Sequence, residues 1–428
     1  MSRIFANASA FRKALMLKGN IRILAVTSML TGAYVSMLSA VLQPFVVLGV
    51  GLSLPALGVL QAVGGRPSGL ASSLVQPVSG TLADAVGRRV MIVAGSVVGI
   101  LSMLSFLAAA LSLSPAFLAV GFVLFGLSLL GSPASQAMIA ESVPSELGRI
   151  GIAFSVVFFF TQLPGAFAPL VAGFAAQAYG YYLIFTAAAV LESFNLVLLS
   201  TQLKETNRNA VPAGRAGPGL SARRLLSVPP GFTRIFAPFA FDAFFGGLVA
   251  GIIYGIWAKA FGLTSGDIGL IVGTLYISVL VWQYPSTRLL LRMGPRKTLA
   301  FSEFLTVIAF AGWMVSVSLP FLMLMSAIFG ASIATWVPSF QSLIMARAPP
   351  EQKGSIAGKF AAFRGIVAFP APAIGGLLYQ AFGYYVPVAA AALGETFTTL
   401  ALLWLLPELG GANRPTSEIN NLGDRSGS

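Results

Sequence analysis

Apolar runs long enough to cross a lipid bilayer recur along the whole chain. A helix needs about 20 apolar residues to span about 30 Å of hydrocarbon. A membrane β-barrel would instead show short segments of alternating polarity. The sequence therefore predicts an all-α polytopic membrane protein with twelve transmembrane helices. The predicted spans are 21–48, 55–83, 90–112, 115–140, 150–178, 181–201, 232–262, 265–291, 297–318, 320–346, 355–381 and 384–406.

Composition supports this class and narrows the chemistry. Of the 428 residues, 57% are hydrophobic and 9% are charged, which is unlike a soluble domain. The chain has no cysteine and no histidine, which excludes disulfides and any metal site built from thiolate or imidazole ligands. The carboxylates within the spans are few and dispersed. We therefore expect no metal, no cofactor and no enzymatic activity, since no clustered acid–base set is evident.

The net charge of +13 is distributed unevenly between the two sets of connections. Arg88 and Arg89 follow the second span and Arg296 follows the eighth, whereas the opposite connections hold only Lys259 and Asp267. Basic residues are typical of cytoplasmic loops. The pattern predicts a multi-pass protein of the plasma membrane with both termini in the cytoplasm. It indicates contact with lipid rather than nucleic acid.

One break in composition divides the chain. Residues 202–231 are polar and rich in proline and glycine, which is typical of a linker. The flanking halves resemble each other, since residues 169–192 and 372–395 share about eleven of 24 positions without a gap. We predict a cytoplasmic lead at 1–20, six-helix bundles at 21–201 and 232–406, the linker at 202–231, and a cytoplasmic tail at 407–428.

A compact motif joins the second and third spans. Its residues Gly80, Asp84, Gly87, Arg88 and Arg89 return about 207 residues later in an eroded copy that lacks the acid. Together with the duplication, the motif resembles motif A of the major facilitator superfamily. That resemblance covers nearly the whole chain and implies two parallel-repeat bundles that move by alternating access. Ala85 departs from the usual basic residue, and the fourth span lacks the arginine of many proton-coupled exporters.

The same motif has a physical interpretation as a conformational gate. Gly80 permits close helix contact, and Gly87 permits a left-handed turn after a helix. A carboxylate such as Asp84 is favoured near the positive N-terminal end of a helix. The family resemblance implies that this helix is the eleventh span, which begins near Gly354. We expect that contact when the cytoplasmic side is closed.

Three ionisable residues fall near the middle of predicted spans, where an unpaired charge is costly. Asp242 and Arg364 each lie about ten residues from the cytoplasmic ends of their spans. A helix rises about 1.5 Å per residue, so equal residue counts give equal depths. They therefore share a depth, and we expect them to pair, either for coupling and solute binding or for structure alone. Arg66 lies at mid-depth in the second span, where it either contacts the solute or caps a broken helix.

Three further acids receive other interpretations. Glu192 and Glu395 occupy equivalent positions on the sixth and twelfth spans, which favours scaffold packing. Glu303 lies close to the predicted cytoplasmic surface, and we expect it to meet loop arginines.

Uncharged polar and aromatic residues gather on several spans that would surround a central cavity. Any one of them is more typical of interhelical hydrogen bonding, so their concentration is the useful signal. The cavity-lining candidates are Tyr34, Gln43, Gln76, Gln136, Gln162, Tyr254, Gln283, Trp336 and Gln341.

These observations predict a secondary active transporter with a site near the membrane midplane. No nucleotide-binding loop of the GxxxxGK(S/T) type is present, so we expect coupling to an ion gradient or no coupling, with protons as the expected ion. The expected solute is a small organic anion or zwitterion, or an amphipathic compound that is exported. The expected partners are that solute, protons and lipid, and the protein is expected to be a monomer. The alternatives are an uncoupled facilitator and a non-transporting sensor on a transporter fold.

Overall fold

The computed structural model describes residues 19–143, 147–206, 232–347 and 353–406. The predicted lead, most of the linker and the tail lie outside these residues. The first half contains α2 (Gly19–Pro44), η1 (Phe45–Gly49), α3 (Leu54–Gly64), α4 (Leu70–Val86), α5 (Arg88–Ser112), α6 (Pro115–Leu127), η2 (Ser128–Gly131), α7 (Ser132–Glu141), α8 (Leu147–Gln162), η3 (Leu163–Ala166), α9 (Ala168–Tyr179) and α10 (Tyr181–Gln202).

The second half repeats this arrangement. Its helices are α12 (Thr233–Ala250), α13 (Ile253–Phe261), α14 (Ser265–Val315), α15 (Leu319–Arg347), α16 (Lys353–Ala368), α17 (Ala371–Phe382) and α18 (Tyr385–Leu405).

The helices reproduce the twelve predicted spans, although several spans are broken. Within the described residues, ten helices are long and apolar enough to cross a membrane, and Leu54–Gly64 is a shorter apolar helix. That short helix and α4 together form the second span. The 51-residue α14 contains two spans, because the chain leaves helical geometry at Gly294, where φ is +75°. Only glycine adopts such a φ without strain, so this residue marks the turn between the eighth and ninth spans.

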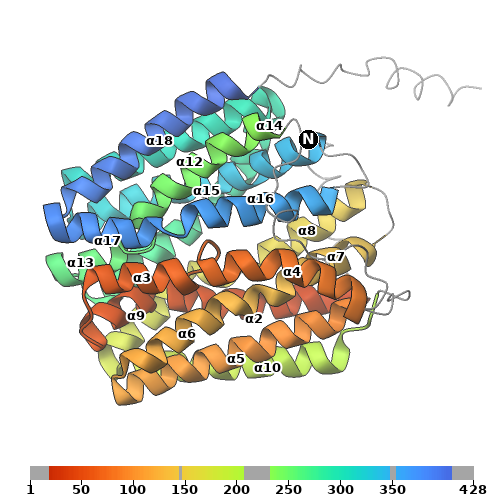
Figure 1. The fold of residues 1–428 in the computed structure, drawn as a ribbon, viewed down its shortest axis with the longest axis horizontal. Coiled ribbons are helices and arrows are strands. Elements are labelled where there is room, and N and C mark those ends of the chain that lie inside the picture. Colours follow the sequence, from red (N-terminus) through yellow and green to blue (C-terminus); the bar gives the residue numbers. More distant parts are fainter. Residues whose placement is uncertain (1–18, 144–146, 207–231, 348–352, 407–428) are drawn as a thin grey trace, which may run out of the picture.

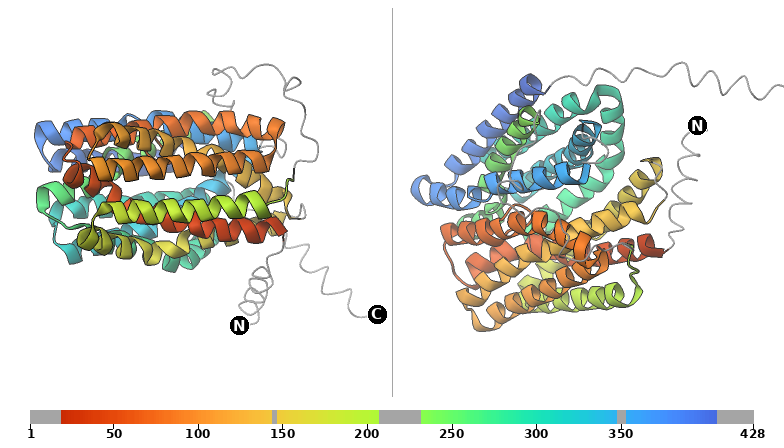
Figure 2. Two further views of the ribbon diagram at one scale, coloured as in Figure 1. Left: turned by 90° about the horizontal axis from the view of Figure 1, so that it is seen from below. Right: turned by 45° about the vertical axis from the view of Figure 1, so that its right-hand side comes forward.

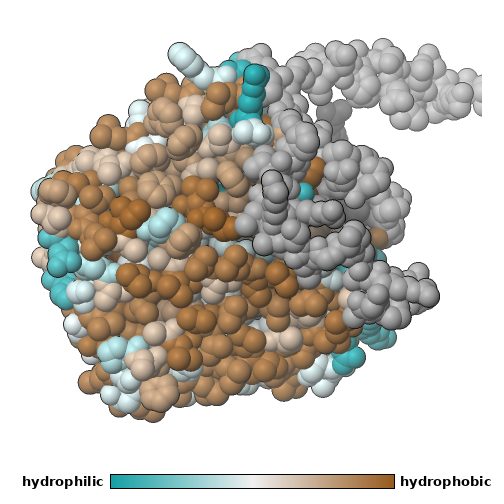
Figure 3. All heavy atoms as spheres, in the orientation of Figure 1, coloured by the Kyte–Doolittle hydropathy of each residue, from teal (hydrophilic) through white to brown (hydrophobic). Residues whose placement is uncertain are grey.

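The helices form two bundles that lie side by side. Figure 1 shows α2 to α10 in one bundle and α12 to α18 in the other, with α3 and α4 facing α17 and α16 across the interface. The views in Figure 2 show that the helix axes of both bundles are roughly aligned with one another. In Figure 3 hydrophobic residues cover most of the visible side, and hydrophilic residues gather near its ends. This arrangement is that of a membrane-embedded helical protein.

We call the end that carries Gly87 and Gly294 the linker end, and the opposite end the far end. At the far end the bundles approach closely through small residues. A side chain at Gly58 would collide with the backbone of Pro372, and one at Gly376 would collide with Pro55. α9 packs against α14 in the same region. The bundles are therefore closed against each other at the far end.

Candidate functional site

The predicted ion pair between the seventh and eleventh spans is present. The guanidinium of Arg364 on α16 donates to Oδ2 of Asp242 on α12, with Nη2 at 2.6 Å and Nε at 3.2 Å. The side chain of Asp242 is 13% exposed and that of Arg364 is 27% exposed. Two donors on one carboxylate oxygen, largely out of solvent, make a strong charge-assisted contact.

An aromatic ring packs against the guanidinium of Arg364. The guanidinium carbon of Arg364 lies 4.6 Å from the centre of the Trp336 ring on α15, which is cation–π geometry. The indole N–H of Trp336 donates to Oε1 of Glu303 on α14 at 2.7 Å. Glu303 is buried at 1% exposure. The expectation that Glu303 meets loop arginines is therefore wrong, because the break at Gly294 directs the ninth span back into the bundle.

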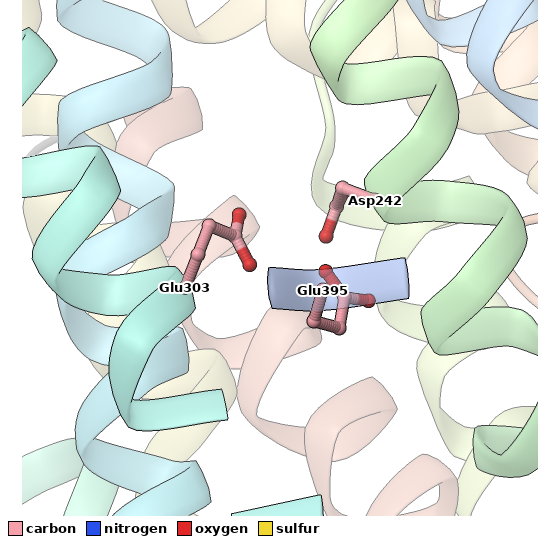
Figure 4. A group of neighbouring side chains, drawn as sticks. All are labelled: Asp242, Glu303 and Glu395. Carbon is pink, nitrogen blue, oxygen red and sulfur yellow. The ribbon is translucent and has the colours of Figure 1, made fainter. Parts of the chain in front are cut away.

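Glu395 on α18 completes a group of three acids. Carboxylate oxygens of Asp242, Glu303 and Glu395 lie within 4.8 Å of one another. Figure 4 shows the three side chains converging from α12, α14 and α18. Glu303 and Glu395 are in hydrogen-bonding contact with each other. Glu395 is 1% exposed, and its Oε2 has no hydrogen-bond partner among the described residues. We call Asp242, Glu303, Glu395 and Arg364 the acid cluster.

The first bundle holds a smaller network around Glu192. Ser96 donates to Oε1 of Glu192 at 2.6 Å, and Asn195 donates to Oε2 at 3.1 Å. The hydroxyl of Tyr34 contacts both Glu192 and Arg66.

Arg66 lies in the break between α3 and α4. Its guanidinium carbon is 4.8 Å from the centre of the Phe125 ring, and Nη1 is buried without a partner among the described residues. Its contacts with Tyr34 and Phe125 are to residues of the first bundle.

Among the cavity-lining candidates, Gln43 has the most specific contacts. Its amide nitrogen donates to the carbonyl of Ala250 at 3.1 Å, and its amide oxygen accepts from the N–H of Gly255 at 3.1 Å. Both groups flank the interruption between α12 and α13, where helical hydrogen bonds are lost. One side chain thus satisfies two backbone groups of the opposite bundle, near the far end.

The other candidates are dispersed. Gln76 donates to Ser72 of its own helix, Gln136 and Gln341 are exposed, and Tyr254 packs against Trp257. Gln162 and Gln283 are half-buried. Of the nine candidates, Trp336 alone contacts the Asp242–Arg364 pair among the contacts described.

The motif between the second and third spans is held at the linker end. Gly87 has φ +113°, the positive value predicted for it. Arg88 pairs with Asp84 at 2.5 Å and with Glu141 at 3.2 Å. The prediction for Gly80 is not supported, because an added methyl would meet only Pro133 at 3.9 Å among the described residues. The expected contact of Asp84 with the start of the eleventh span involves side chains outside the described residues.

Two features of this end were not predicted. The carboxylate of Glu205 accepts the backbone N–H groups of Arg88 at 3.0 Å and Arg89 at 2.9 Å, so it caps the start of α5. Arg89 donates to the carbonyl of Ser200, and Arg296, its equivalent in the second half, donates to that of Leu403. In the first repeat this hydrogen bond connects the third span to the end of the sixth. In the second repeat it connects the ninth span to the end of the twelfth.

Sequence reasoning missed that Glu303 and Glu395 belong to the acid cluster. One signal was available. Glu303 follows Ser96 by 207 residues, the same spacing that relates Arg296 to Arg89. Ser96 contacts Glu192 in the structure, so the same spacing would have placed Glu303 beside Glu395, the counterpart of Glu192.

Comparison with known proteins agrees with the fold and the duplication. No curated protein matches the sequence. Among solved structures, a human organic anion transporter is similar at 16% identity and TM-score 0.66, covering 90% of this chain and 98% of that one. A nucleoside transporter has 14% identity and TM-score 0.67, with 91% and 98% covered. A D-xylose–proton symporter has 14% identity and TM-score 0.69, with 91% and 98% covered.

At such identities these similarities establish the fold alone. The sequence itself goes further, because a profile of the Major Facilitator Superfamily matches residues 24–256 and again residues 235–423. The two matches together cover most of the chain. The first covers nearly all of the first bundle and continues into α13, and the second covers nearly all of the second bundle. The protein is a multi-pass membrane transporter that belongs to the Major Facilitator Superfamily.

Proposed function

We propose that this transporter couples protons to the movement of a small organic anion or zwitterion by alternating access of a midplane site. The observation that carries the proposal is the Asp242–Arg364 pair, which is partly exposed and lies on α12 and α16. Four ionisable groups gathered within the membrane-spanning helices are typical of a solute or ion pathway.

The chemistry of the pair suggests how coupling works. A proton on Asp242 neutralises its carboxylate and weakens its hold on Arg364. The guanidinium is then available to an anionic group of the solute, which it can bind with two parallel hydrogen bonds. Trp336 keeps the guanidinium plane in place during the exchange, since the cation–π contact does not depend on the protonation of Asp242.

Similar structures show that this fold serves transporters of the proposed kind. One similar structure is an organic anion transporter and another is a proton symporter. Arg364 supplies the positive group that an anionic solute needs.

The test is uptake into proteoliposomes, with and without an imposed pH gradient, across matched anionic, zwitterionic and neutral solutes. Arg364→Gln is expected to abolish uptake of the anionic solute. A matched control is Arg288→Gln, because Arg288 also lies over an aromatic ring, at 4.5 Å from the centre of Tyr284, but is exposed. Unchanged flux when the gradient is imposed, for every solute, would refute proton coupling.

A further inference from the structure

Glu303 and Glu395 are not part of the Asp242–Arg364 ion pair. With them, the second bundle has more buried carboxyl groups than positive groups to balance them. Ionisable groups reach the acid cluster from α12, α14, α16 and α18, and α15 contributes only the uncharged indole of Trp336. These groups are three carboxyls and one guanidinium. If all were ionised, the cluster would carry a net charge of about −2 out of water, which is strongly unfavourable.

The first bundle provides the contrasting case within the same chain. Its network has one carboxyl, Glu192, and one guanidinium, Arg66, joined through the hydroxyl of Tyr34. One positive and one negative group balance without any added ion. The two repeats therefore differ in charge balance although Glu192 and Glu395 occupy equivalent positions.

The hydrogen-bond donors around Glu192 and around the equivalent Glu395 also differ. Glu192 accepts from the hydroxyl of Ser96, which always carries a proton. At the equivalent position, 207 residues later, Glu303 faces Glu395. A carboxyl group can donate to Glu395 only when it is protonated.

The second donor is also missing. Asn195 donates to Glu192, whereas Thr398, which follows Asn195 by the 203 residues that separate Glu192 from Glu395, donates to the carbonyl of Gly394 in its own helix. Oε2 of Glu395 is consequently buried with no partner among the described residues. A buried oxygen without a donor, next to a second carboxyl, indicates that a proton belongs there.

We infer that Glu303 and Glu395 form a proton-binding site behind the ion pair, and that this site supplies the proton that reaches Asp242. The inference rests on the proposed function, and it adds the residues that store the coupling ion. Two protons neutralise the acid cluster, because two of its three carboxyl groups are then uncharged and the remaining carboxylate balances the guanidinium. The site takes protons rather than a metal ion, since Trp336 and Arg364 already occupy acceptor positions that a cation would need.

The transfer balances without any other reactant. A proton leaves the carboxyl of Glu303 and binds the carboxylate of Asp242; one oxygen of each group lies within 4.8 Å of the other. Glu303 becomes a carboxylate, Asp242 becomes neutral, and the guanidinium of Arg364 is released toward the solute. Glu395 then shares its remaining proton with Glu303, so both buried acids keep a hydrogen bond.

The direct test is infrared spectroscopy of the purified full-length protein, which distinguishes protonated carboxyl groups from carboxylates and needs no solute. At neutral pH the wild type should show a protonated-carboxyl band. Glu303→Gln or Glu395→Gln should each reduce it by about half, because one proton fewer then balances the cluster. The double variant should abolish it. Glu192→Gln is the matched control and should leave the band unchanged, because Glu192 is balanced by Arg66.

Glu303→Ser tests the same point with the residue that the first repeat uses. This variant should fold and still exchange solute across proteoliposomes, but it should lose accumulation driven by a pH gradient. Loss of the band in Glu192→Gln, no band in the wild type, or accumulation that responds to added Na⁺ or Ca²⁺ but not to pH would overturn the inference. Absence of any solute flux in the wild type would refute the proposed function alone, because the infrared result does not depend on flux.

Discussion

Removing Arg364 should destabilise the protein more than removing its partner Asp242. Arg364→Gln leaves three buried carboxyls without their guanidinium, and loss of one partner of a buried pair costs about 3–5 kcal/mol. Asp242→Asn removes a charge-assisted hydrogen bond, at about 1.5–3 kcal/mol. Arg364 is still balanced in that variant, because Glu303 and Glu395 remain beside it. The double variant should be no less stable than Arg364→Gln alone, because it has one acid fewer to neutralise.

The destabilisation should also depend on pH. Without Arg364 the folded state must bind additional protons to neutralise the cluster, and the unfolded state need not. Stability then falls as pH rises, because the folded state holds more protons than the unfolded state. The loss in Arg364→Gln should therefore be smaller at about pH 5 than at about pH 8.

Thermal unfolding of purified variants in detergent measures these effects, with Arg288→Gln as the exposed arginine control. Two outcomes would refute the reasoning. Equal destabilisation by the two single substitutions would mean that Glu303 and Glu395 do not compensate Arg364. A double variant that loses the sum of the two single effects would mean that the pair is not energetically coupled.

Three further predictions concern the ends of the bundles and their interface. Gln43→Leu should open the far end, because two backbone groups of α12 and α13 lose their partner at about 1–3 kcal/mol each; a cysteine at Leu57, which is buried in the closed structure, should then react faster with a thiol reagent. Glu205→Gln should lower stability by about 1 kcal/mol through loss of charge at the start of α5, measured by thermal unfolding, and no change would reject the capping role. Gly365→Ala should block transport, because the added methyl would collide with a serine hydroxyl of α4, while Gly273→Ala, which meets only ordinary contacts at 3.7 Å or more, should transport normally.

The sequence predicted the spans and the central pair because both depend on distance along a helix. Asp242 and Arg364 were matched by counting residues from the cytoplasmic ends, and a regular rise per residue makes that count reliable. The turn at Gly87 was predictable because glycine adopts positive φ without strain.

The acids of the cluster were not predictable by the same route. Depth along α14 or α18 does not say which way a side chain points, and lipid is as apolar as the bundle interior, so amphipathicity gives no direction. Glu303 and Glu395 therefore received interpretations that depended on depth alone. The role of Gln43 depended on an interruption at Gly251 that no proline marks.

The two repeats suggest how a duplicated bundle acquires an asymmetric task. Both keep the arginine that anchors the third or ninth span, and both keep an acid on the sixth or twelfth span, so these contacts serve the shared fold. The difference lies in the donors around that acid: Ser96 in the first repeat corresponds to Glu303 in the second, and Asn195 corresponds to Thr398. A hydroxyl donor keeps Glu192 satisfied at any pH, whereas a second carboxyl makes the hydrogen bond of Glu395 depend on a proton. One bundle can then remain a rigid partner while the other changes its charge, which is what coupling to a proton gradient requires.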